Sequence, residues 1–157
     1  MKKIFKLIIG FVAILAVFFL VIKIQYSRNA NKLYSPPAFE IHEEVLKADV
    51  ELGKRIFTIR SGCIDCHGSN LAGAKVMDDP AMGSVYGANI TPFNLKSWTD
   101  EEIATAIRYG IHKEKRSLKF MPSFDYEGLS KSDVAAVIAY VRSVPEVNSP
   151  SHENSFG

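Results

Sequence analysis

The first two dozen residues form an apolar run that does not suit an ordinary soluble core. From Ile4 to Ile24 the chain is almost entirely hydrophobic, and Leu7 to Ile22 contains no charged residue and no proline. As a helix, this run would measure about 31 Å, which matches the hydrocarbon thickness of a bilayer. We therefore expect a transmembrane anchor over residues 1–24, because a helix that is apolar on all sides needs lipid or a large protein around it.

A cleaved secretory signal is the alternative to an anchor, since signals also combine early lysines with an apolar helix. The apolar region of a signal normally spans about 7–15 residues and ends in small residues. Here the run is longer, and it ends in large side chains from Phe18 to Ile22. An uncleaved anchor is therefore favoured, and cleavage stays open.

Three further segments are expected after the anchor. Residues 25–44 form a polar linker with a stiff Ser-Pro-Pro stretch, residues 45–148 form one folded domain, and residues 149–157 form a flexible tail. The chain after residue 24 is nearly neutral, with 15 basic and 17 acidic side chains. This balance argues against nucleic acid as a partner, because binding to phosphates needs a basic footprint.

Three helices are indicated in the folded domain by apolar spacing and by end signals. They are expected over about residues 48–60, from Thr99 to Gly110 and from Ser130 to Pro145. Thr99 and Ser130 each precede an acidic residue by three positions, which is typical of a capping box. The connection over residues 68–97 is long for a domain of this size, which indicates that it wraps around something.

The chain has only two cysteines, and the segment Cys63-Ile64-Asp65-Cys66-His67 has the spacing C-x-x-C-H. This spacing is typical of covalent haem attachment, in which two thiols add across haem vinyl groups and the adjacent histidine binds iron. We therefore predict one haem c, held by Cys63 and Cys66, with His67 as an axial ligand of the iron. A zinc site would need two more ligands at metal spacing, and a thioredoxin-like pair would need a βαβ pattern.

A second axial ligand is expected far along the chain. Three methionines follow the start residue: Met77, Met82 and Met121. Met121 is favoured as a metal ligand beside His67, because Pro122 would stiffen a loop that must hold sulfur against iron. The other histidines are expected in solvated or flexible segments, with the first of them as the second choice of ligand: His112, His42 and His152.

With these residues in place, the chain resembles class I cytochromes c. In particular it is similar to the membrane-anchored monohaem domains in cytochrome subunits of membrane-bound dehydrogenases and related respiratory chains. The resemblance runs from about Leu46 to Val147 and is carried by C-x-x-C-H and by these pieces: Gly53-Lys54-Arg55-Ile56-Phe57, Asn89-Ile90-Thr91-Pro92, Trp98-Thr99-Asp100-Glu101-Glu102, Met121-Pro122, Leu129-Ser130 and Ala139-Tyr140-Val141-Arg142-Ser143. It implies an all-α fold of three to five helices around one haem. It also implies that the first and last helices cross near Gly53, Phe57 and Tyr140, with His67 and Met121 as axial ligands.

Two protein ligands on the iron would leave no open coordination position. We therefore expect outer-sphere electron transfer at a moderately positive potential by an electron carrier that is not itself an enzyme, whether free or as a subunit of an oxidoreductase complex. The alternative is a haem-based enzyme or sensor of peroxide or a gas, with an open sixth coordination position.

The anchor and the haem motif together predict the compartment. We expect a single-pass protein of a bacterial inner (cytoplasmic) membrane, with its N-terminus in the cytoplasm and its haem domain on the periplasmic or extracytoplasmic side. There it would relay electrons between respiratory partners, such as a dehydrogenase, a quinol-oxidising complex or a terminal oxidase. A basic cluster precedes Met121 and is interpreted either as a solvated surface or as a docking site for an acidic partner: Lys113, Lys115, Arg116 and Lys119.

Overall fold

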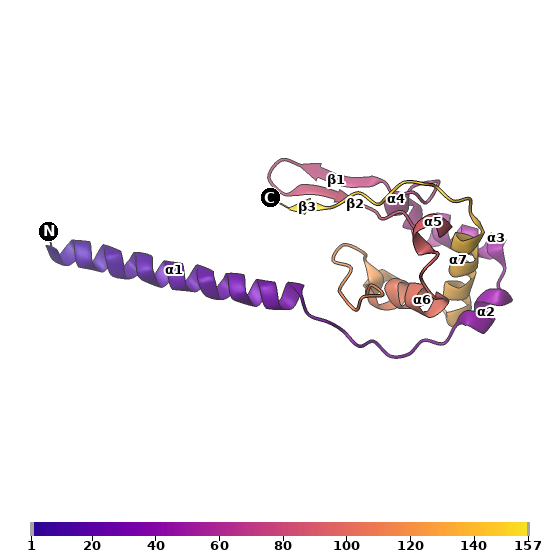
Figure 1. Ribbon diagram of the computed structural model, residues 1–157, viewed down its shortest axis with the longest axis horizontal. Coiled ribbons are helices and arrows are strands. Elements are labelled where there is room, and N and C mark those ends of the chain that lie inside the picture. The colour runs from indigo at the N-terminus through magenta and orange to yellow at the C-terminus, as the bar shows by residue number, and fades with distance from the viewer. Residues whose placement is uncertain (1, 157) are drawn as a thin grey trace.

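In the computed structural model, which describes residues 2–156, the chain begins with one long helix, α1 (Lys2–Ala30). The helix projects away from the rest of the chain, and none of its residues is buried (Figure 1). It is long and apolar enough to cross a membrane. The same length and composition would suit a signal sequence near the N-terminus.

The remaining elements form a body of short helices with one small sheet (Figure 1). Their order is α2 (His42–Leu46), α3 (Val50–Arg55), a π-helical turn η1 (Ile56–Arg60), α4 (Cys63–His67), β1 (Lys75–Asp79), β2 (Gly83–Tyr86), α5 (Pro92–Leu95), α6 (Asp100–Tyr109), a 3-10 turn η2 (Ser123–Tyr126), α7 (Lys131–Ser143) and β3 (Ser155–Phe156). The three helices predicted from the sequence correspond to α3 with η1, to α6 and to α7. The other helices are single turns that have too few residues to show an apolar period.

Both predicted capping boxes are confirmed. The Thr99 hydroxyl accepts a hydrogen bond from the backbone N–H of Glu102 at 3.2 Å, and the Glu102 carboxylate accepts one from Thr99 N–H at 2.9 Å. Ser130 and Asp133 make the same reciprocal pair at the start of α7. Each box satisfies backbone donors that a helix start would otherwise leave unpaired.

Helices α3 and α7, the first and the last of the three helices predicted from the sequence, cross at a glycine, as the resemblance implied. A Cβ on Gly53 would overlap the backbone carbonyl of Ala136 in α7, so only glycine allows the two helices to approach this closely. One turn further along, the rings of Phe57 and Tyr140 lie 5.4 Å apart between centroids. The buried core is built around this crossing, and its most completely enclosed side chains include Phe57, Ile138 and Val134.

The all-α prediction is wrong for the connection over residues 68–97, which contains a β-hairpin. β1 and β2 pair antiparallel, and β3 from the C-terminus adds to β2, so the strand order is β1-β2-β3. The Asp79 carboxylate accepts hydrogen bonds from the N–H groups of Ala81 and Met82 and so closes the turn. Because most side chains of β1 are exposed, the segment lacks the alternation by which strands are predicted.

The two histidines expected in flexible segments have defined partners in the structure. His42 Nδ1 lies 2.7 Å from a carboxylate oxygen of Asp100, and the His152 ring lies 4.8 Å from the ring of Tyr86. The chain just before His42 also packs against the folded body, since Ile41 is buried in the core. Residues on both sides of the folded domain therefore contact it.

Candidate cofactor site

The C-x-x-C-H segment forms a helix of a single turn, α4, between two glycines. Gly62 and Gly68 have φ angles of +60° and +77°, which are left-handed values that other residues rarely adopt. The chain can therefore turn sharply into and out of α4. Within the turn, Cys63 lies three residues before Cys66 and four before His67, so the three side chains share one face of the helix.

Cys63 and Cys66 carry free thiols that are not joined to each other. Burial raises the pKa of Cys63 to about 11 and also raises the pKa of Cys66. Tyr126, a residue of η2 that lies far along the chain, is close enough to Cys63 for each of the two groups to affect the pKa of the other. Among residues 2–156, no group of three or more His, Cys, Asp and Glu side chains could hold a metal ion.

His67 is held by a single hydrogen bond that defines its tautomer. Its Nδ1 lies 2.8 Å from the backbone carbonyl oxygen of Ala88. A carbonyl oxygen only accepts, so Nδ1 carries the proton and the lone pair is on Nε2. Burial lowers the pKa of His67, which favours the neutral ring. This is the state in which an imidazole binds iron, with its second nitrogen oriented by a backbone acceptor.

The carbonyl that orients His67 is positioned by close packing of the chain. A Cβ on Gly87 would overlap the backbone carbonyl of Cys66, so the two segments touch along their backbones. Two hydrogen bonds fix their register: Gly87 N–H donates to Ala74 O at 2.9 Å, and Ala74 N–H donates to Cys66 O at 3.0 Å. The residue after Gly87, Ala88, is thereby brought to the ring of His67.

Two buried polar residues, Asn89 and Thr91, fix the chain directly after Ala88. Asn89 and Thr91 are 2 % and 0 % exposed. The amide of Asn89 donates to the carbonyls of Val147 at 3.0 Å and Ser149 at 2.6 Å, while its oxygen accepts from Thr91. The C-terminal chain is therefore bound to the residues next to Ala88. Because these buried groups are all paired, the segment has little freedom to shift.

Met121 lies half-buried against the hydrophobic core, in a loop that is bonded on both sides. Leu118 N–H donates to Gly110 O at 2.7 Å, and Ser123 N–H donates to Met121 O at 2.8 Å. The η2 turn follows directly, and its Tyr126 lies close to Cys63. The structure thus brings the chain that carries Met121 to α4, across more than fifty residues of sequence.

The other sulfur and imidazole groups are placed differently. Met77 lies in β1, and Met82 lies at the turn of the hairpin with 58 % of its surface exposed. The expectation that His112 is solvated is wrong: its ring lies edge-on to Trp98, 4.7 Å between centroids, and burial lowers its pKa. The short loop brings His112 back onto Trp98 because its ends pair as an isolated β-bridge.

Three supporting features were not predicted from the sequence: the close packing of Gly87, the Ala88 carbonyl and the Tyr126 contact. The glycine content of the long connection was a signal for close backbone approach. No sequence signal could have identified the carbonyl of Ala88 or the hydroxyl of Tyr126, because any residue supplies a carbonyl and tyrosines are common in cores.

Comparison with protein families gives a match. The family model described as Cytochrome c matches residues 50–145, which include α4, the Asn89–Thr91 pair and Met121. The matched part covers more than half of the chain. No curated protein matches the sequence.

Proposed function

We propose, from the premise that this chain belongs to the cytochrome c family, that it carries single electrons on one haem c. The family match implies haem c and electron transfer. The observation that carries the proposal is the 2.8 Å bond from His67 Nδ1 to the Ala88 carbonyl, which leaves Nε2 available beside two free thiols. When bound, haem supplies an iron centre that cycles between the ferric and ferrous states.

The residues of the site fit this group. Cys63 and Cys66 would hold it through two thioether bonds, so that it cannot dissociate from a small domain. His67 would bind the iron through Nε2, and the Ala88 carbonyl would keep the ring in one orientation. Met121 would supply a second ligand to the iron from its bonded loop, and a thioether ligand raises the potential.

We also propose that α1 is an uncleaved, single-pass anchor in a bacterial cytoplasmic membrane. Its apolar side chains are exposed along its whole length, as lipid contact requires. The haem domain would then lie on the extracytoplasmic side, with residues 31–41 as a short connection. A short connection suits a local relay between membrane-bound redox proteins, such as a dehydrogenase, a quinol-oxidising complex or a terminal oxidase.

Covalent attachment is tested first. We expect acid–acetone extraction of the denatured protein to leave the haem on the polypeptide. In the Cys66→Ser variant one thioether is lost, so the reduced pyridine complex should show a shifted absorption maximum. Pigment that is freely extracted from the wild type would contradict the proposal.

Ligation by Met121 is tested by optical spectroscopy. The oxidised wild type should show a low-spin spectrum with the weak red band of a sulfur–iron bond. Met121→Ala should lose that band and lower the midpoint potential, whereas Met82→Ala is the matched control and should change neither. A five-coordinate, high-spin wild type would instead support a haem enzyme or sensor.

A further inference from the structure

After the uncharged run from Leu7 to Ile22, positive charge is concentrated in two segments of the chain. Residues 23–34 contain three basic and no acidic side chains, and residues 111–119 contain four basic and one acidic side chain. The acid, Glu114, is paired with Arg116. The remainder of the chain after Tyr34, residues 35–110 and 120–157, has nine basic and sixteen acidic side chains. The haem domain is therefore strongly asymmetric in charge.

Residues 111–119 fold as a small loop, the basic loop. Ile111 and Ser117 pair as an antiparallel bridge, and His112 N–H donates to Arg116 O at 2.8 Å. Lys115 has a φ of +65° in the turn between them. Three basic residues of the loop are exposed to solvent: Lys115, Arg116 and Lys119.

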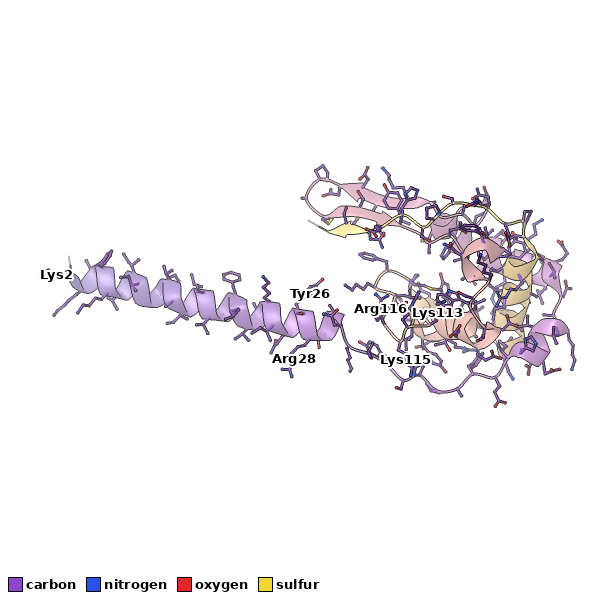
Figure 2. The ribbon with its side chains drawn as sticks, viewed as in Figure 1. Lys2, Tyr26, Arg28, Lys113, Lys115 and Arg116 are labelled. Atoms are coloured by element: carbon purple, nitrogen blue, oxygen red, sulfur yellow. The ribbon has the colours of Figure 1, made fainter. Side chains whose placement is uncertain are left out.

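The basic loop lies beside the end of α1. The backbone N–H of Tyr34 donates to Lys115 O at 2.9 Å, so the chain that leaves α1 is bonded to the turn of the loop. The Lys119 ammonium lies 6.0 Å from the centroid of the Tyr26 ring in the last turns of α1. Figure 2 shows Lys115 and Arg116 on the side of the domain that faces α1, near Tyr26 and Arg28.

We propose that the basic loop, together with Arg28 and Lys32, binds the phosphate groups of anionic phospholipids and so docks the haem domain on the bilayer. Lysine and arginine side chains beside a membrane anchor are attracted to anionic headgroups, and each strengthens the association about fivefold. This inference rests on α1 spanning the membrane, as proposed above. It does not depend on the chemistry of the haem.

The position of the loop favours lipid over an acidic protein as its partner. The Tyr34–Lys115 bond keeps the loop within a few residues of the end of α1, where headgroups are always present. The acidic excess on the rest of the domain would be repelled by the same surface. An anionic bilayer surface attracts the basic loop and repels the acidic remainder of the domain. Together these two forces select one orientation of the domain on the membrane.

Hydrogen exchange tests the proposal on the full-length, haem-loaded protein in lipid nanodiscs. We expect backbone exchange in peptides from residues 111–119 to be about fivefold or more slower in phosphatidylglycerol nanodiscs than in phosphatidylcholine nanodiscs. High salt should remove the difference, because screening weakens attraction between exposed charges. Equal exchange in the two lipids would overturn the proposal.

Matched variants identify the side chains responsible. The triple variant Lys115→Gln, Arg116→Gln, Lys119→Gln should lose the lipid-dependent protection. The control variant removes three exposed positive charges on α2 and α3 or next to them, at the far end of the domain from α1, and should keep it (Figure 1): Lys47→Gln, Lys54→Gln and Arg55→Gln. Protection that is lost equally in both variants would show an effect of net charge alone and would contradict a local site.

Two further readouts separate the alternatives. If poly-glutamate protects the loop in phosphatidylcholine nanodiscs while anionic lipid does not, the surface fits an acidic protein and the lipid proposal is wrong. The absorption spectrum of the same samples reports the haem independently. Lipid protection in a protein without covalent haem would therefore support docking while contradicting the proposed electron carrier.

Discussion

Gly87 packs against Cys66 so closely that a Cβ on residue 87 would overlap the Cys66 carbonyl. This contact brings the next carbonyl, that of Ala88, to within 2.8 Å of His67 Nδ1. The orientation of the proposed iron ligand therefore depends on a residue without a side chain, about twenty positions further along the chain. Substitutions that never touch the cofactor should for this reason alter how it is held.

Gly87→Ala should destabilise the protein and impair haem attachment. The added methyl group meets backbone atoms, which cannot move aside as a flexible side chain can, so we expect a loss of about 1–3 kcal/mol or more. Urea unfolding and the yield of covalently loaded protein measure both effects. Gly128→Ala is the control, because nothing lies within 4 Å of its added Cβ. If both variants unfold alike, the close contact at Gly87 has no energetic role.

Asn89→Ala should cost about 2–3 kcal/mol, because it leaves buried donors and acceptors without partners. The Val147 and Ser149 carbonyls lose their donor, and Thr91 loses its acceptor. The C-terminal chain should also exchange its amide hydrogens faster. Asn148→Ala is the control, since that side chain is exposed between the two carbonyls. Unchanged exchange after residue 145 in Asn89→Ala would contradict the role given to this pair.

Arg142→Gln should cost about 2–3 kcal/mol in unfolding free energy, since it breaks charge-assisted hydrogen bonds in a partly buried place. The guanidinium donates to Asp100 at 3.0 and 3.1 Å and to the Leu95 carbonyl at 2.8 Å. Arg60→Gln is the comparison, because the Arg60–Asp133 pair has an arginine that is 57 % exposed. That variant should cost less than about 1 kcal/mol. A smaller effect at Arg142 than at Arg60 would refute this ranking.

The contribution of His42 to stability should depend on pH. Its hydrogen bond to Asp100 raises the pKa of His42 above the ordinary value of 6.5. A group with a raised pKa binds its proton more tightly in the folded state. Its contribution is therefore complete below pH 6.5 and is lost as the pH rises through the raised value. Unfolding free energies of the wild type should fall relative to His42→Gln over this range. A constant difference between the two proteins from pH 5 to pH 9 would contradict the prediction.

The parts of the site that sequence reasoning predicted are those encoded within a few neighbouring residues. Cys63, Cys66 and His67 are recognisable because their spacing is itself the signal. The capping boxes at Thr99 and Ser130 are equally local, and the structure confirms them. The hairpin in the long connection was missed, because its strands are exposed and its third strand comes from the end of the chain.

The sequence by itself determined the apolar span of α1, the C-x-x-C-H motif and the starts of α6 and α7, since each depends on residues within one or a few turns of one another. Only the tertiary structure decided which carbonyl orients His67, which carbonyls Asn89 binds sixty residues away, and that the basic loop lies beside the end of α1. These contacts join distant segments, and they form because the core around the α3–α7 crossing fixes where those segments can run. No local pattern of side chains records that geometry.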